Sequence, residues 1–170
     1  GLLQYLAQGA QENAQYVLNL RGLCGGVQPL FIGKGKNMSE YRSYTEQMTV
    51  LDGDSDFRRC LKPSALFRYV EQVSADHARA YGMDHAFFRE RRSAFLVGKQ
   101  ALRVWRMPGR AEKINLTTAC EAFKKGTMKR LTTITSETGE KLALVDCRWM
   151  IVDTEAGRIL RTPGWTMPDF

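Results

Sequence analysis

Residues 63–81 read PSALFRYVEQVSADHARAY, and this stretch decides the fold. Five of its side chains recur at steps of four, three, four and four residues, which places them on one face of a helix: Leu66, Val70, Val73, His77 and Tyr81. Pro63 suits the first helical position, where a missing N–H costs nothing, and Gly82 suits the position just past the end. The sequence therefore predicts one long amphipathic helix from Pro63 to about Tyr81.

Strand-like runs surround this helix, and turn-rich loops separate them. The run Tyr41 to Leu51 precedes it, with Tyr44, Met48 and Val50 at even spacing. A short second helix is expected over about Asp84 to Arg91. The runs that follow end in a short finishing strand or tail: Ala94 to Met107, Lys113 to Phe123, Met128 to Ser136, Lys141 to Asp153, and Arg158 to Arg161. In the run from Met128, we expect Leu131, Thr133 and Thr135 to share one side.

One long helix followed by a meander of long antiparallel strands predicts an α+β fold of the hotdog type, in which a curved sheet wraps around a central helix. We expect residues 38–170 to form this single domain. Residues 1–37 differ in composition, since a Gln-, Ala- and Leu-rich stretch from Leu2 to about Arg21 has helical spacing and a glycine-rich connection follows. Because Met38 suits a natural start, residues 1–37 are either a native extension or added sequence.

The formal net charge of +7 and the sequence pI near 9.4 favour anionic partners such as a CoA nucleotide, a phosphopantetheine group or an acidic carrier protein. Nucleic acid is an unlikely partner, because the basic clusters lack the interleaved aromatic residues that stack on bases. These clusters are Arg89, Arg91 and Arg92, and Lys124, Lys125, Lys129 and Arg130.

The four cysteines, Cys24, Cys60, Cys120 and Cys147, form no CxxC pair, which argues against a zinc ribbon or a redox motif. Their wide spacing and the lack of a signal peptide predict free thiols in the cytoplasm. No apolar run is long enough to cross a membrane. Two histidines are too few for a His-rich metal site, so no metal is expected.

The run Phe67 to Ala78, FRYVEQVSADHA, resembles the helix of the N-terminal hotdog of acyl-ACP thioesterases, which reads leucine, acidic or amide residues, small residues and then Asn-His-Ala. Phe95-Leu96-Val97 resembles the Trp-Val-Leu strand of that family. Trp149 to Asp153, followed by Arg158 to Pro163, resembles its last strand and arginine-rich exit. The similarity covers roughly Tyr41 to Pro163 as an ordered pattern.

This resemblance implies acyl-thioester chemistry in fatty-acid or polyketide metabolism, with acyl-CoA or acyl carrier protein as the partner and no cofactor. The catalytic Asp-x-Asn-x-His run of the family lies in a second hotdog, and the 170 residues contain no such run. The resemblance therefore leaves two functions open, a thioester hydrolase and a non-catalytic module that binds acyl thioesters. A lone hotdog leaves a sheet edge uncovered, so we expect a homodimer or higher oligomer.

Three helix residues are candidates for the chemistry. Glu71 could act as base or nucleophile, or be a solvated carboxylate. Asp76 could be a base or an orienting group, or pair with Arg79 or Arg68. His77 could orient the thioester carbonyl or a water, or be a core histidine on the apolar stripe.

Further candidates lie near the start of the helix. The amides around Ser64 and Ala65 could stabilise an oxyanion, or simply begin an ordinary helix. Asp52, Asp54 and Asp56 could include the base or be turn acids, and a calcium loop fails because its twelfth position is Pro63. Cys60 could be a nucleophile at the helix start, whereas His85 belongs to no motif.

Overall fold

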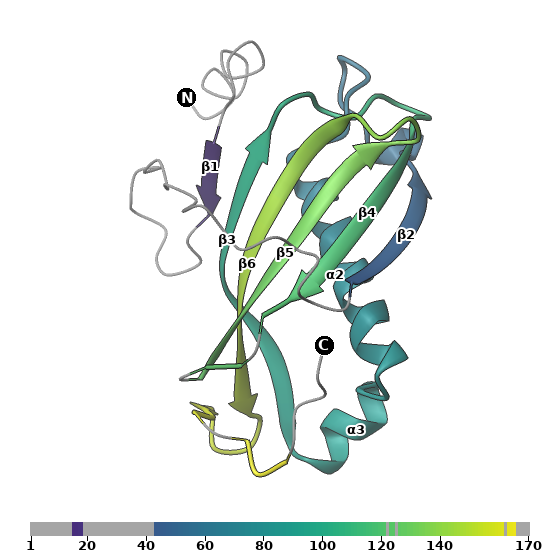
Figure 1. The fold of residues 1–170 in the computed structure, drawn as a ribbon. Coiled ribbons are helices and arrows are strands. Elements are labelled where there is room, and N and C mark those ends of the chain that lie inside the picture. The colour runs from purple at the N-terminus through teal and green to yellow at the C-terminus, as the bar shows by residue number, and fades with distance from the viewer. Residues whose placement is uncertain (1–14, 19–42, 122, 125, 162, 166–170) are drawn as a thin grey trace.

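The computed structural model describes residues 43–121, 123–124, 126–161 and 163–165, together with the backbone of residues 15–18. Within these residues, seven strands form one antiparallel sheet in the order β1-β3-β6-β5-β4-β2, and β7 pairs with β6 (Figure 1). The strands are β1 (Gln15–Leu18), β2 (Ser43–Thr49), β3 (Ser93–Val104), β4 (Lys113–Cys120), β5 (Thr127–Ser136), β6 (Lys141–Asp153) and β7 (Arg158–Ile159). The helices are the 3₁₀ turn η2 (Asp52–Asp54), α2 (Pro63–Ala80) and α3 (His85–Glu90).

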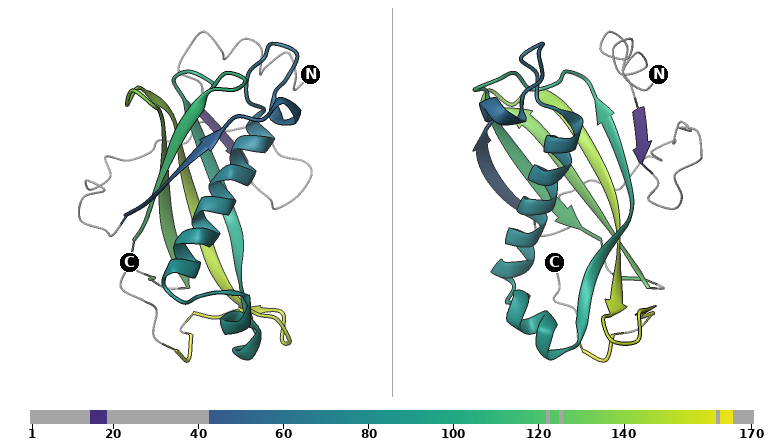
Figure 2. Two further views of the ribbon diagram at one scale, coloured as in Figure 1. Left: turned by 90° about the vertical axis from the view of Figure 1, so that its right-hand side faces the viewer. Right: turned by 180° about the vertical axis from the view of Figure 1, so that it is seen from behind.

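The sheet curls around α2, which lies along its concave face (Figure 2). A register shift between Val97 and Lys99 interrupts the pairing of β3 with β6 and marks a bulge. At Gly98 a side chain would have to displace Met150, because an added Cβ would lie 2.6 Å from the Met150 Cε atom. The result is the hotdog arrangement, so the predicted fold class is confirmed.

The helix begins and ends where its sequence predicts. Pro63 is the first helical residue and Lys62 precedes it as the N-cap. Tyr81 caps the C-terminus and Gly82 follows with φ of 77°, a left-handed conformation that glycine adopts without a Cβ penalty. The short second helix also forms, because the Asp84 side chain accepts a hydrogen bond from the Phe87 N–H at 2.8 Å.

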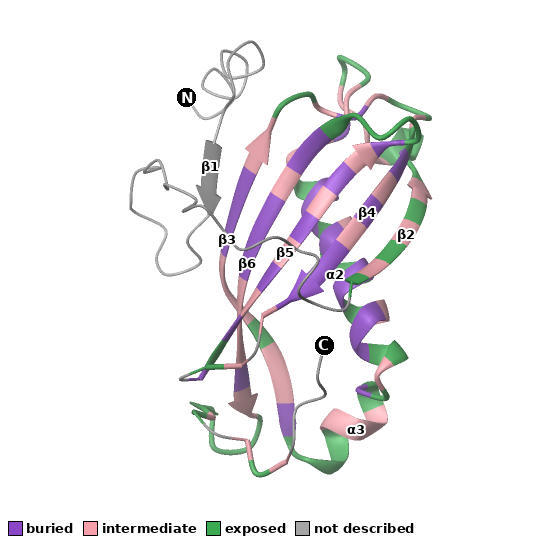
Figure 3. Ribbon diagram, viewed as in Figure 1, coloured by how far each residue is buried: buried purple, intermediate pink, exposed green. Residues whose placement is uncertain are grey.

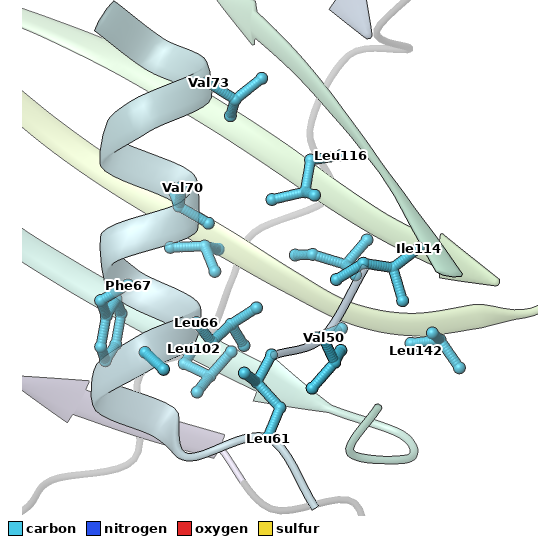
Figure 4. Close-up of a cluster of buried hydrophobic side chains, with 14 of the residues drawn as sticks. Val50, Leu61, Leu66, Phe67, Val70, Val73, Leu102, Ile114, Leu116 and Leu142 are labelled. Atoms are coloured by element: carbon cyan, nitrogen blue, oxygen red, sulfur yellow. The ribbon is translucent and has the colours of Figure 1, made fainter. Parts of the chain in front are cut away.

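The hydrophobic core lies between the first half of α2 and the part of the sheet that faces it (Figure 4). Its members come from every layer and are almost fully buried: Val50, Leu61, Ala65, Leu66, Val70, Val73, Leu102, Ile114, Leu116, Ile134 and Leu142. Along β4 and β5 buried positions mostly alternate with partly exposed ones, as a sheet with one covered face requires (Figure 3).

One expectation is wrong. Residues 15–18 form the strand β1, paired with Gln100–Arg103 of β3, where a helix over 2–21 was expected. The unpaired edge of β3 offers backbone partners to this run, and Tyr and Val favour strands; the rest of residues 1–37 lies outside the described part. The expectation for β5 is confirmed, because Leu131, Thr133 and Thr135 share one side, which is the less buried one. The buried side consists of Met128, Arg130, Thr132, Ile134 and Ser136.

Candidate functional site

A cavity of about 320 Å³ lies below the core, between the second half of α2, the start of α3 and the sheet. Five apolar or aromatic side chains line it: Met83, Phe88, Phe95, Met128 and Trp149. The rings of Phe88, Phe95 and Trp149 meet edge to face, with centroids 5.1 Å apart for the first pair and 5.9 Å for the second. This wall suits an apolar ligand.

The helix contributes one face to the cavity. Glu71, Ala75 and Arg79 recur every four residues, and Ser74 and Ala78 lie beside them. Small side chains at three of these five positions leave room between the helix and the sheet. Asp84 and His85, at the start of α3, complete the lining with polar groups.

A buried polar group lines the same cavity. Arg130 of β5 is 2% exposed, and its Nη1 atom lies 2.9 Å from His77 Nδ1 and 3.1 Å from the Thr118 hydroxyl oxygen. The Thr132 hydroxyl donates to the same oxygen at 2.9 Å. These contacts join α2, β4 and β5 through one guanidinium group.

His77 is neutral at physiological pH. Burial, reinforced by the charge of Arg130, lowers the pKa of its imidazole from 6.5 to about 4. Because a guanidinium only donates, the Nδ1 atom accepts, which puts the proton of the neutral ring on Nε2. The ring stacks on Tyr44 at 5.6 Å and meets the edge of Tyr81 at 5.3 Å. His77 is therefore a packed core histidine that helps to position Arg130.

Two buried thiols flank Arg130 in the sheet register, Cys120 on β4 and Cys147 on β6. Burial raises the pKa of the Cys120 thiol to about 11 and that of Cys147 to about 12. Both thiols are therefore protonated at neutral pH and make poor nucleophiles. In the described part of the chain, no group of three or more His, Cys, Asp or Glu side chains could hold a metal ion.

The family model described as "Acyl-ACP thioesterase N-terminal domain" matches residues 41–164, well over half of the chain. The chain belongs to this family. No curated protein matches it by sequence. Among its described residues, no helix is both long and apolar enough to cross a bilayer.

Solved structures of similar fold extend this result. A putative oleoyl thioesterase from Lactobacillus plantarum has a TM-score of 0.71 at 19% identity, over 74% of this chain and 49% of that one. An acyl-ACP thioesterase from Bacteroides thetaiotaomicron VPI-5482 scores 0.65 at 19% identity, over 69% and 48%. A hypothetical protein from Staphylococcus aureus, solved in complex with CoA, scores 0.67 at 11% identity, over 72% and 78%. The chain thus spans about half the length of the first two.

The structure places the three candidate residues of α2 in different surroundings. Glu71 is exposed and lines the cavity. His77 is 2% exposed, and its ring contacts the guanidinium group of Arg130. Asp76 is not among the cavity residues, since it pairs with Arg79 and accepts a hydrogen bond from Gln72 at 2.9 Å.

The candidates near the start of α2 lie at the other end of the helix. Ser64 is exposed and Ala65 is buried in the core, and neither lines the cavity. Seven residues of helix place Ser64 roughly 10 Å from Glu71 along the axis. One thioester carbonyl therefore does not reach both the first-turn amides and a water activated by Glu71. The role of Ser64 and Ala65 stays a prediction.

The turn acids before the helix have structural contacts. Asp54 pairs with Arg68 and accepts from the Tyr69 hydroxyl at 2.8 Å. Asp56 accepts from the backbone N–H groups of Arg58 and Cys60, and Asp52 pairs with Arg110. The Cys60 thiol lies 3.7 Å from the Arg58 carbonyl oxygen.

Sequence reasoning missed the residues of the sheet that face the cavity. Arg130 was taken as part of a surface basic cluster, yet it shares the phase of Met128 and Ile134. A charged residue in phase with two apolar ones is the signal that could have found it. Phe88, Phe95 and Trp149 come from three elements, and only their packing brings them together.

Proposed function

We propose that this chain holds the acyl group of an acyl thioester in the cavity below α2 and takes part in its hydrolysis, in fatty-acid or polyketide metabolism. The carrier is CoA or an acyl carrier protein. The observation that carries this proposal is an apolar cavity of about 320 Å³ with the carboxylate of Glu71 in its wall. That volume is at the lower end of small-molecule sites, which favours a medium-length acyl group.

In this mechanism Glu71 is the general base. Its carboxylate takes a proton from a water molecule as the water oxygen attacks the thioester carbonyl carbon. The carbon–sulfur bond then breaks, and the leaving thiolate recovers the proton from Glu71. The products are a free carboxylic acid and the thiol of the carrier.

A second function is favoured by how little of its longer structural relatives this chain covers. The chain covers only about half of the acyl-ACP thioesterase from Bacteroides thetaiotaomicron, and its 170 residues contain no Asp-x-Asn-x-His run. An acyl-binding half without its own catalytic residues is consistent with both facts. In that case the cavity binds the acyl group and turnover needs residues from elsewhere.

Glu71→Gln separates the two functions. We expect the full chain to hydrolyse octanoyl-CoA slowly, measured by chromatography of released CoA, and the variant to be slower by a factor on the order of 10²–10⁴. Glu90→Gln is the matched control, because Glu90 is an exposed carboxylate on α3 that does not line the cavity.

Binding of octanoyl-CoA without any release of CoA would establish the binding module instead. Full activity in Glu71→Gln would move the role of base to Asp76 or to Asp52, Asp54 or Asp56, which single Asn variants would identify. If octanoyl-CoA neither binds nor turns over, the proposed function is wrong.

We also propose that the chain assembles into a homodimer. Among the residues that the structure describes, the sheet ends at β2 on one side, and β1 pairs with Gln100–Arg103 of β3 on the other. Within this described part, most of both edges therefore keeps backbone groups that another sheet could pair with. Sedimentation at micromolar concentration should give the mass of a dimer, and a monomer throughout would contradict it.

A further inference from the structure

We propose that the cavity selects acyl groups that carry an oxygen function in addition to the thioester, either an oxo group or a carboxylate. Arg130 and Trp149 are the two donors that would recognise this oxygen. The inference rests on the proposed function, because it assumes that an acyl chain occupies the cavity. It assigns a specificity role to two residues of the sheet wall, beside the apolar side chains of Met128, Phe88 and Phe95.

Arg130 places donor groups and a permanent positive charge in the cavity wall. Its side chain is almost fully buried, and its contacts with His77 and Thr118 fix the position of Nη1. A guanidinium has five N–H donors, accepts no hydrogen bond and keeps its charge at any physiological pH. Because the Arg130 side chain itself is buried, its charge attracts an oxygen more strongly than a charge at the surface would.

Trp149 provides a second donor on the neighbouring strand. Its Nε1 atom is buried, and no hydrogen-bond partner for it exists among the residues that the structure describes. Buried donors without an acceptor are rare because they forfeit the bond they would make to water. A ligand oxygen in the cavity would supply that acceptor, whereas a plain hydrocarbon chain would not.

The sheet register brings the two donors close together. Arg130 pairs with Cys147 and Met128 pairs with Trp149, so Arg130 and Trp149 are diagonal neighbours on β5 and β6. Long side chains at such diagonal positions reach the same point above a sheet. Met128, Phe88 and Phe95 surround that point with apolar surface. One oxygen placed within an aliphatic chain matches this pattern.

The test uses thioether analogues of CoA, which are not hydrolysed and lack the thioester carbonyl. The probes are S-octyl-CoA, S-(3-oxooctyl)-CoA and S-(7-carboxyheptyl)-CoA, titrated into the full chain by calorimetry. We expect at least one oxygenated probe to bind at least tenfold more tightly than S-octyl-CoA. Arg130→Met should abolish this preference, and Trp149→Phe, which removes only the indole N–H and keeps an aromatic ring, should reduce it two- to tenfold.

Met128→Leu is the matched control, since it alters an apolar side chain on the same wall and should keep the preference. Equal affinity of the wild-type chain for all three probes would overturn the inference and leave the proposed function intact. A preference that survives both Arg130→Met and Trp149→Phe would also overturn it. Binding of none of the probes would instead count against the proposed function itself. Should Arg130→Met not fold, Trp149→Phe decides.

Discussion

The two halves of α2 pack differently against the same sheet. The first half packs Ala65, Leu66 and Val70 with no exposed surface against apolar strand residues. The second half carries small residues, a neutral histidine and the wall of a cavity, and it faces a buried arginine. The comparison teaches that one helix packs tightly against the sheet at one end and borders a cavity, the proposed ligand site, at the other.

The strand residues opposite each half explain the difference. Opposite the first half, Leu102, Ile114 and Leu116 are fully buried members of the same core cluster. Opposite the second half, the wall consists of Met128, Trp149 and Arg130, and Ser74, Ala75 and Ala78 are too small to fill the gap. A cavity of this kind lacks the close contacts that stabilise a packed core. In this part of the interface between α2 and the sheet, tight packing therefore does not decide which residues are present.

Leu66→Ala should cause the largest loss of stability. Its side chain is fully buried in the core, so truncation removes contacts and leaves a void. The free energy of unfolding should therefore fall by about 3–5 kcal/mol. Urea unfolding should show this loss, and Met83→Ala, at the cavity wall, should cost distinctly less. Similar costs for both variants would erase the distinction between the two halves.

The next largest effect should come from acidification, which should lower the stability contributed by the second half of α2. Because the pKa of His77 falls from 6.5 in the unfolded chain to about 4 in the fold, the unfolded state binds more protons between these values. Stability from this group is therefore complete above pH 6.5 and decreases by roughly 3 kcal/mol as pH falls to 4. Urea unfolding across this range should show the decrease, and His77→Gln should lack that component.

Enlarging an alanine should have opposite consequences at the two ends. Ala65→Leu forces extra volume into a filled core and should cost about 1–3 kcal/mol. Ala75→Leu extends into the cavity, so stability should change by less than about 0.5 kcal/mol while acyl-CoA affinity decreases. Thermal unfolding and calorimetric titration measure both effects. Equal destabilisation by the two variants would mean that the cavity closes around its lining.

The smallest expected effect concerns Glu46 on β2, which faces Asp76 of the second half of α2. Burial, together with the charge of Asp76, raises the pKa of the Glu46 carboxyl. A raised pKa means that ionisation disfavours the fold, so Glu46→Gln should stabilise the protein slightly at neutral pH. This gain should disappear in acid, where Glu46 is protonated in both states. A loss of stability at pH 7 would contradict this account.

Local patterns were sufficient for α2, since periodicity, Pro63 and Gly82 set its face and both ends. In β5 they grouped Leu131, Thr133 and Thr135 correctly on one side, but they failed to indicate that the opposite side, with Met128 and Ile134, is the buried one. They also failed at residues 15–18, because a strand there depends on the free edge of β3. Glu71 was predicted as a candidate because it stands on the predicted helix, and its role stays a prediction, since nothing local distinguishes it from an ordinary surface carboxylate.

The sequence by itself determined the hotdog fold and the long helix, because alternation, helical spacing and turn residues act over short stretches of chain, and its motifs resembled those of the family. Only the tertiary structure decided that Arg130 is buried, that His77 is neutral, and that Glu71 lines a cavity which Ser64 does not. These properties depend on water exclusion and on contacts between strands distant in sequence. No local pattern encodes such contacts, so the cavity emerges only when the sheet has curled around its helix.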